Sequence, residues 1–170
     1  MKCRIRMCLV ASAALAWNVA QAGAPSRPLV VELFTSQGCS SCPPADEVLG
    51  QLSRRPEVLA LAFHVDYWDS YGWRDRFELP QSVERQNAYV RNFRHSSAFT
   101  PQFVIDGRTD DVKANTITQA MQESRDAVPL ALAVRNGQVV VDVGGREGKH
   151  PGEVQLVTFL RHALSSVGRG

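Results

Sequence analysis

Two cysteines separated by two residues are the strongest chemical feature of the sequence. Cys39 and Cys42 lie in the string GCSSCP, residues 38–43, between a predicted strand and a predicted helix. Unpaired backbone N–H groups and the positive end of the helix dipole stabilise a thiolate there, and the thiolate is the attacking species in disulfide exchange. Because two intervening residues let the second thiol close a disulfide, the pair can take up or hand over two electrons.

The predicted roles of the two cysteines differ. Proline suits the first turn of a helix, so the helix is predicted to begin at Pro43 with Cys42 as its cap. The turn at residues 35–38 would leave Cys39 at the surface while Cys42 packs under the helix. We therefore expect Cys39 to attack the substrate and Cys42 to resolve the mixed disulfide.

The first 22 residues have the pattern of a cleaved secretory signal. Lys2, Arg4 and Arg6 precede an apolar stretch over residues 8–16, and the small-x-small string AQA ends at Ala22. Cleavage after Ala22 would leave 148 of the 170 residues, with the CxxC pair as the only cysteines. We therefore expect a periplasmic or secreted protein.

Composition places the remaining chain among ordinary globular proteins. Hydrophobic residues make up 44% of the full sequence and charged residues 21%, which excludes a disordered chain. Loss of three of the 19 Lys and Arg residues would leave 16 against 17 acidic residues, a formal charge of −1 that does not favour nucleic acid as a partner. No segment after residue 22 is long and apolar enough to cross a bilayer.

Two other interpretations of the cysteine pair stay open. A purely structural disulfide would close a loop of about four residues and contribute only ~2 kcal/mol by chain entropy. Two thiolates would also suit Cu(I), whereas zinc would need two further ligands and no second cysteine pair follows the signal. The export context favours redox chemistry over both interpretations.

Apolar runs and turn residues predict the strands that position the cysteines. The predicted strands are 29–34, 58–65, 102–105, 130–134, 139–143 and 154–160. Asn136 and Gly137 separate two of them by a dipeptide typical of a type I′ hairpin turn. The first three strands alternate with helices, which predicts an α/β fold followed by a β-rich tail.

Amphipathic patterns predict three helices between these strands. The first begins at Pro43 and buries Val48, Leu49 and Leu52. The second spans about 81–94 with Val83, Val90 and Phe93 on one side, and the third spans 116–126. In the second helix, Arg85, Gln86 and Tyr89 recur at helical spacing, and we interpret them as a solvated face with one packed tyrosine.

The order of these elements resembles the thioredoxin superfamily over residues 29–128. The order begins with a strand, the CxxC and a helix, and continues with a second strand and a second helix. Thr100-Pro101 then precedes a third strand. X-Pro bonds are cis in only about 5–6% of cases. The resemblance nevertheless implies a cis bond at Pro101, placed opposite the cysteines, where its backbone would help to dock the substrate chain.

Three separated strings resemble, more closely, an exported bacterial thioredoxin-like family catalogued as a domain of unknown function. They are ELFTSQGCSSCPPAD at 32–46, HVDYWD at 64–69 and TPQ at 100–102. The resemblance implies a thioredoxin-like mixed sheet flanked by helices at 29–128, and the hairpin pattern predicts a short β-hairpin-containing extension at 129–170. That family usually continues into a longer β-rich part, so we expect the extension to be truncated.

Glu32 and a loop of aromatic residues are further site candidates. Glu32 lies inside an apolar strand, where a carboxylate is costly unless it finds partners. It could relay protons to the resolving thiol, or it could be a satisfied structural carboxylate. Tyr67, Trp68 and Trp73 follow the second strand and could form an apolar shelf for a peptide, or they could cap the core. We interpret His64 as hydrogen-bonded structure rather than as a metal ligand.

The sequence thus predicts an exported thiol-disulfide oxidoreductase. Cys39, Cys42, Pro101 and Glu32 would act on a protein or peptide disulfide that contacts Thr100 and the aromatic loop, and a redox partner would recycle the pair. No organic cofactor and no metal are expected, because the disulfide is itself the redox group. The alternative is a non-enzymatic binding module in which the CxxC is a Cu(I) site or a structural disulfide.

Overall fold

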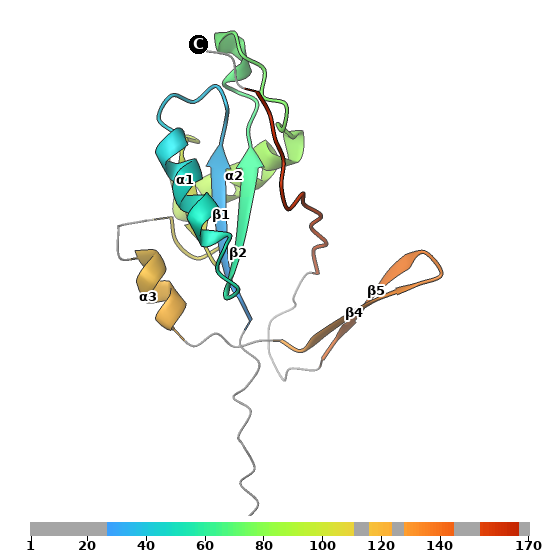
Figure 1. Ribbon diagram of the computed structural model, residues 1–170. Coiled ribbons are helices and arrows are strands. Elements are labelled where there is room, and N and C mark those ends of the chain that lie inside the picture. Colours follow the sequence, from blue (N-terminus) through green and yellow to red (C-terminus); the bar gives the residue numbers. More distant parts are fainter. Residues whose placement is uncertain (1–26, 111–115, 124–127, 145–153, 167–170) are drawn as a thin grey trace, which may run out of the picture.

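A three-stranded mixed sheet forms the centre of the protein. The computed structural model describes residues 27–110, 116–123, 128–144 and 154–166 (Figure 1). The central strand β1, Leu29–Thr35, pairs in parallel with β2, Val58–His64, and antiparallel with β3, Gln102–Ile105. The strand order is β2-β1-β3, so the predicted mixed sheet flanked by helices is confirmed. No helix in the described ranges is long and apolar enough to cross a membrane.

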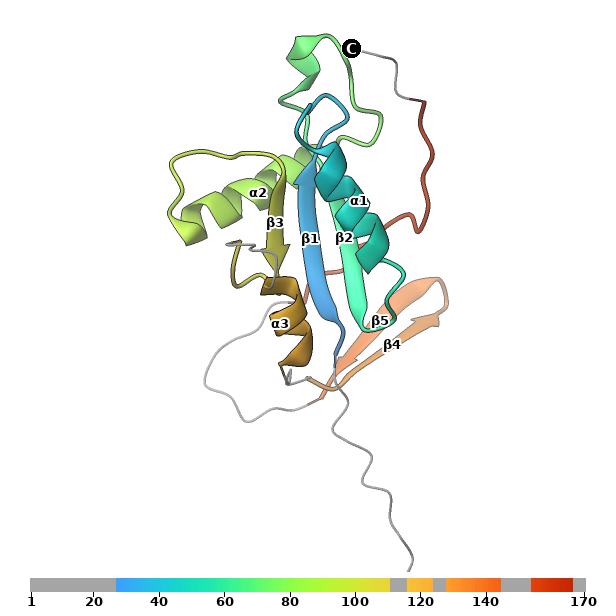
Figure 2. The ribbon, with the colours of Figure 1, turned by 60° about the vertical axis from the view of Figure 1, so that its left-hand side comes forward.

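Helices cover both faces of this sheet. The helix α1, Pro43–Leu52, and the short helix α3, Thr116–Gln122, lie on one face, and α2, Pro80–Phe93, lies behind the strands on the other (Figure 2). A short 3₁₀ turn, η1, spans Asp69–Tyr71 in the loop between β2 and α2. Two separate apolar clusters result, one for each face of the sheet.

The helix α1 begins where the sequence predicts. Cys42 is its N-cap and Pro43 its first residue. Leu49 and Leu52 are buried as predicted, but Val48 is 41% exposed. The prediction for Val48 was wrong because the helical register turns Ala45, Leu49 and Leu52 toward the sheet and leaves Val48 beside that stripe.

The helix α2 buries a different stripe from the one predicted. Val83 and Phe93 are only half-buried, whereas Ser82, Gln86 and Tyr89 are the buried residues. The interpretation of Arg85 and Gln86 as a solvated face was therefore wrong, because Gln86 is buried and Arg85 is half-buried, whereas the packed tyrosine at position 89 is confirmed. Hydrogen bonds and an ion pair to the sheet offset the cost of burying these polar groups.

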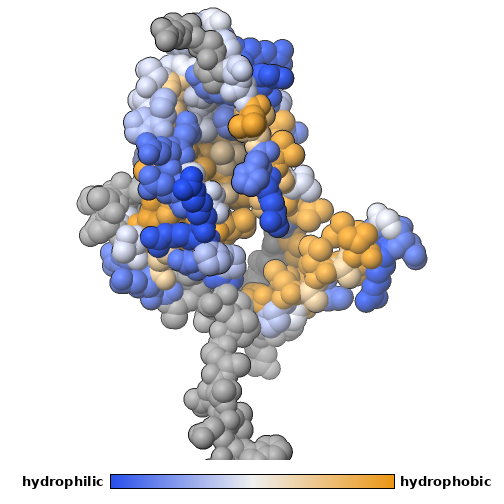
Figure 3. All heavy atoms as spheres, in the orientation of Figure 1, coloured by the Kyte–Doolittle hydropathy of each residue, from blue (hydrophilic) through white to orange (hydrophobic). Residues whose placement is uncertain are grey.

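The C-terminal hairpin matches its prediction. The strands β4, Leu130–Arg135, and β5, Gln138–Val143, pair antiparallel around Asn136 and Gly137. The φ angles of these two residues are 52° and 75°, as a type I′ turn requires. The hairpin projects away from the sheet in Figures 1 and 2, and Figure 3 shows its largely apolar surface.

The predicted last strand, 154–160, is not a strand. These residues are exposed and pair with no strand in the described part of the chain. An apolar run without a partner strand gains no ladder of hydrogen bonds. The apolar pattern alone was therefore not sufficient to predict a strand here. The predicted third helix is confirmed over Thr116–Gln122, while residues 124–127 and the signal at 1–22 lie outside the described residues. The division at residue 128 stays a prediction.

Candidate active site at the carboxyl edge of the sheet

Parallel pairing brings the ends of β1 and β2 to the same edge of the sheet. Thr35, the last residue of β1, is in register with His64, the last residue of β2. The chain then turns at residues 36–42 into α1, and this turn contains the two cysteines. They form a disulfide with an S–S distance of 2.10 Å and a Cα–Cα distance of 5.4 Å. The structure therefore contains the CxxC disulfide that the sequence spacing allows.

Both cysteines are buried in this disulfide form. Cys39 is 2% exposed and Cys42 is fully buried. The expectation that the turn leaves Cys39 at the surface was therefore wrong. The turn folds back on itself, because the Cys39 N–H donates to the Ser36 carbonyl at 3.1 Å and the Cys42 N–H donates to the Cys39 carbonyl at 3.2 Å. Exposure thus does not distinguish an attacking from a resolving cysteine.

Trp68 connects the cysteine turn to the Thr100–Pro101 segment. Its indole Nε1–H donates to Thr100 Oγ1 at 2.8 Å, while a Cβ on Gly38 would lie only 3.0 Å from the Trp68 Cβ. Glycine at position 38 therefore allows the turn to approach the tryptophan closely. The Thr100–Pro101 bond is cis, as predicted.

Pro101 reaches the same edge as the cysteines. Gln102, the first residue of β3, is in register with Phe34 near the end of β1. Because β3 is antiparallel to β1, the start of β3 lies where β1 ends. The sheet thus brings Cys39, Cys42, Thr100 and Pro101 to one region of the molecule.

The aromatic loop is anchored by its polar atoms. Trp73 Nε1–H donates to Gln37 Oε1 at 3.0 Å, and the Tyr67 hydroxyl donates to Gln86 Oε1 at 3.3 Å. Tyr67 and Trp68 also pack against the apolar cluster on the α2 face, and burial raises the pKa of Tyr67. In this loop, Tyr71 is the exposed ring, at 78%. Tyr67 and Trp68 of this loop therefore cap the core, while the ring of Tyr71 faces solvent.

Asp75 ties that loop to the cysteine turn and to β2. Its buried carboxylate accepts from His64 Nδ1 at 2.7 Å, from the Gln37 N–H at 2.8 Å and from the Phe77 N–H at 2.9 Å. Burial acts to raise the pKa of Asp75, but these hydrogen bonds outweigh it and lower the pKa below its ordinary 3.8. His64 is thus hydrogen-bonded, as expected.

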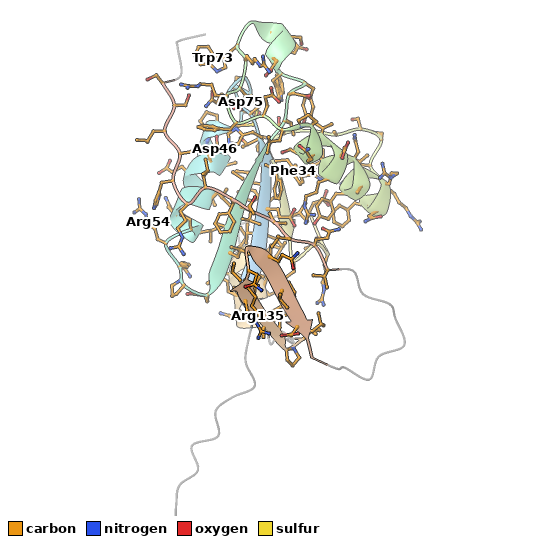
Figure 4. All side chains as sticks on the ribbon, turned by 90° about the vertical axis from the view of Figure 1, so that its right-hand side faces the viewer. Phe34, Asp46, Arg54, Trp73, Asp75 and Arg135 are labelled. Carbon is orange, nitrogen blue, oxygen red and sulfur yellow. A yellow bond between two sulfur atoms is a disulfide. The ribbon has the colours of Figure 1, made fainter. Side chains whose placement is uncertain are left out.

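Asp46 is a second carboxylate beside the cysteines. It lies in the first turn of α1, and Oδ1 accepts from the Thr35 hydroxyl at 2.8 Å. Asp46 is exposed, but partial loss of surrounding water still raises the pKa of its carboxyl group, while the Thr35 hydrogen bond and the nearby His64 act in the opposite direction. Figure 4 shows Asp46, Asp75 and Trp73 at the same end of the molecule. The sequence prediction did not include either aspartate.

Glu32 lies on the other side of the sheet. It is 2% exposed, and its carboxylate accepts from both Arg85 Nη2 at 2.7 Å and the Tyr89 hydroxyl at 2.8 Å. Burial and the neighbouring Glu32 raise the pKa of Tyr89. Side chains alternate along a strand, so Glu32 faces α2 while its neighbour Leu33 faces α1. The structure therefore does not bring Glu32 to the cysteines.

The side chain of Gln86 is hydrogen-bonded to residues on both sides of the Thr100–Pro101 bond. Its side-chain N–H groups donate to the Phe99 carbonyl at 2.8 Å and to Gln102 Oε1 at 3.0 Å, and Gln102 in turn donates to Asp110 at 2.8 Å. Sequence analysis missed this network. A sequence pattern that could have predicted it is the spacing of four and three residues between Ser82, Gln86 and Tyr89. This spacing places polar residues on one helix face, the arrangement usually seen for buried apolar residues.

Comparison with known proteins gives the class and the family. The fold and the site define a mixed α/β domain that carries a CxxC disulfide where β1 leads into α1. The chain belongs to the family described as "Protein of unknown function (DUF1223)", which matches residues 30–170. The predicted membership of a family of unknown function is thus confirmed. Among the described residues, no group of three or more His, Cys, Asp or Glu is placed to hold a metal ion.

One solved structure is similar to this chain. It is the crystal structure of protein AGR_C_4864 from Agrobacterium tumefaciens, a structural genomics target, with 34% sequence identity and a TM-score of 0.60. The match covers 72% of this chain and 58% of that protein, so this chain spans less than two thirds of its relative. A search of the curated proteins finds no match.

Proposed function

We propose that this protein is an exported thiol-disulfide oxidoreductase of the thioredoxin superfamily. The observation that carries the proposal is the Cys39–Cys42 disulfide at the start of α1, with Pro101 at the same edge of the sheet. The order of strands around the CxxC and the proline before β3 support the superfamily assignment. The secretory pattern of residues 1–22 supports a periplasmic or secreted location.

The exchange uses two electrons and two protons. In the reduced protein, the Cys39 thiolate attacks one sulfur of a substrate disulfide, a Cys39–substrate bond forms, and the other substrate sulfur leaves as a thiolate that takes a proton. The Cys42 thiol then loses its proton and attacks Cys39. The Cys39–Cys42 bond forms, and the second substrate sulfur leaves and is protonated. The protein dithiol is oxidised and the substrate disulfide is reduced, and the same steps run in reverse for an oxidase.

The backbone supports Cys39 as the attacking residue. Cys42 is the N-cap of α1, and its carbonyl accepts from the Ala45 and Asp46 N–H groups at 2.9 and 3.0 Å. Cys39 stands before the helix in the turn, where its N–H donates to the Ser36 carbonyl and its Sγ lies 3.5 Å from Ser41 Oγ. A substrate chain would meet Thr100 and Pro101 and the loop that contains Tyr67, Trp68 and Trp73. The exposed Tyr71 ring adds apolar surface there.

Trapping of the mixed disulfide tests this function. The exported Cys42→Ser protein lacks the resolving thiol, so it should accumulate a reducible high-mass adduct on non-reducing electrophoresis. The matched Cys39→Ser protein should form no adduct. The reduction potential of the wild-type pair should lie between about −270 and −120 mV. Absence of any adduct, together with a potential below about −300 mV, would contradict the proposal.

The burial of both sulfur atoms favours one competing function. Cys39 and Cys42 are almost inaccessible in the disulfide form, as a static clip in a non-enzymatic binding module would be. A clip predicts equal loss of stability, by about 2 kcal/mol, in both cysteine variants and no trapped partner in either. Equilibrium unfolding of the two variants beside the trapping experiment separates these functions.

A further inference from the structure

Three ionisable side chains lie around the ends of β1 and β2, directly beside the cysteine turn. They are Asp46, His64 and Asp75, from α1, β2 and the aromatic loop. Asp75 is ionised at neutral pH because its pKa is lowered, and an ionised carboxylate can only accept hydrogen bonds. His64 Nδ1 is therefore the donor in the 2.7 Å contact to Asp75. This bond fixes the orientation of the imidazole, whose side chain remains 21% exposed.

The position of Asp46 on α1 relates it to Cys42. The Asp46 N–H donates to the Cys42 carbonyl at 3.0 Å, which is the first i to i+4 bond of the helix. Cys42 already has helical dihedral angles, φ −79° and ψ −32°. Side chains at i and i+4 share one helix face with Cβ atoms about 5–6 Å apart. The Asp46 carboxyl group is thus the acid–base group one turn from the Cys42 thiol.

Thr35 fixes the direction of that carboxyl group. The Thr35 side chain is buried, and its hydroxyl donates to Asp46 Oδ1 at 2.8 Å, so Oδ2 is not engaged by this bond. Thr35 is also in register with His64 on the neighbouring strand. The sheet edge therefore places Asp46, Thr35 and the His64–Asp75 pair in one continuous group next to the CxxC.

We propose that Asp46 is the proton-transfer residue for Cys42, with Thr35 as the residue that positions its carboxyl group and His64–Asp75 as the adjoining hydrogen-bonded pair. This inference rests on the proposed exchange function. Asp46 takes the proton of the Cys42 thiol as that sulfur attacks Cys39. It returns the proton to the substrate sulfur that leaves, so that the resolving step is neutral overall. The raised pKa of Asp46 supports this role, because a stronger base accepts a thiol proton more readily.

The other charged groups near this site do not fit the role. Glu32 lies on the opposite face of the sheet, bonded to Arg85. Glu78 bridges to His64 through its backbone, and its carboxylate pairs with Arg74. Asp69 accepts from the Asp75 N–H. In α1, the remaining carboxylate is Glu47, which is exposed like Asp46 but contacts Gln51 instead of Thr35. Glu47 therefore provides a matched control in the same helical turn.

The test measures the collapse of a mixed disulfide with glutathione. Reduced wild-type, Asp46→Asn and Glu47→Gln proteins are mixed with oxidised glutathione, quenched with acid and analysed by mass spectrometry between pH 5 and 9. Below pH 7, the Asp46→Asn protein should resolve the Cys39–glutathione intermediate about 100-fold more slowly. Its rate should recover at alkaline pH, where hydroxide replaces the carboxylate as acceptor. The Glu47→Gln protein should match the wild type.

Thr35→Val provides a second variant in case Asp46→Asn does not fold. It removes the hydroxyl with little change in shape, and it should slow the collapse in the same pH range. If Asp46→Asn and Thr35→Val both match Glu47→Gln in rate and pH profile, the assignment of Asp46 is overturned. The glutathione experiment needs no protein substrate, so a missing protein adduct in the trapping experiment would overturn the proposed function separately from the result for Asp46.

Discussion

The two faces of the central strand β1 are stabilised in different ways. On the α1 face, Leu29, Val31 and Leu33 pack against Leu49 and Leu52, and the buried polar residue Thr35 lies only at the end of the strand, bonded to Asp46. On the α2 face, Phe34 is accompanied by the buried Glu32, which needs Arg85 and Tyr89 as partners. The apolar face depends on volume and periodicity, whereas the polar face depends on specific pairs that lie far apart in the sequence.

The largest expected effect is on the apolar face. Leu33→Ala removes a fully buried side chain from the middle of the α1 cluster and leaves a cavity. We expect a loss of about 3–4 kcal/mol in the free energy of unfolding, measured by urea denaturation. The control Leu33→Ile conserves volume and should cost less than about 1.5 kcal/mol. Equal losses in the two variants would mean that packing volume does not determine the stability of this face.

The polar face should show asymmetry between the two partners of its ion pair. Arg85→Leu leaves Glu32 buried without its cation, and we expect a loss of about 3 kcal/mol. Glu32→Leu should cost less, because the Arg85 side chain is already 31% exposed and can turn to water. Replacement of both by leucine should recover part of the loss, since no charge is then left buried. Unfolding of the two single variants and the double variant completes the cycle, and simple additivity would contradict this explanation.

These two faces also explain which features could be predicted from the sequence. The cap at Cys42, the burial of Leu49 and Leu52 and the Asn136-Gly137 turn follow from patterns within a few residues. The partner of Glu32 does not, because Arg85 is 53 residues away and apolar periodicity contains no information on charge pairing. A carboxylate inside an apolar strand predicted that some partner must exist, but not which one.

The same distinction applies to the candidate site. The CxxC spacing predicted the disulfide, and the resemblance to the thioredoxin superfamily predicted the position of Pro101 at the same edge of the sheet. The His64–Asp75 and Asp46–Thr35 contacts depend on how a loop and a helix fold over the sheet edge, which no local pattern specifies. The burial of Cys39 was missed for a related reason, because the turn folds back on itself through the bond from the Cys39 N–H to the Ser36 carbonyl.

Acid should separate the polar contacts from the apolar ones. The pKa of Asp75 is lowered below 3.8 in the folded protein, so its contribution to stability is fully present above that value and is lost as the pH falls through the folded pKa. We expect the free energy of unfolding to decrease below about pH 4, the ordinary range of aspartate. In the Asp75→Asn protein this decrease should be smaller, whereas in Leu33→Ala it should match the wild type. An unchanged slope in Asp75→Asn would contradict the role of this carboxylate.

The smallest expected effect concerns Val48 and tests the register of α1 on the apolar face. Val48 is 41% exposed, while the adjacent Leu49 is buried against the sheet. Val48→Ala removes little buried surface and replaces a β-branched residue with a better helix former. We expect a change within about 0.5 kcal/mol, because these two contributions have opposite signs.

Leu49→Ala, one position along, should cost about 2–4 kcal/mol because it opens a cavity under the helix. The two variants differ by one residue in position and by roughly 100° around the helix, so denaturation curves for both locate the buried stripe. A larger loss for Val48→Ala than for Leu49→Ala would show that α1 is rotated on the sheet, and would also remove the basis for the contact between Asp46 and Thr35.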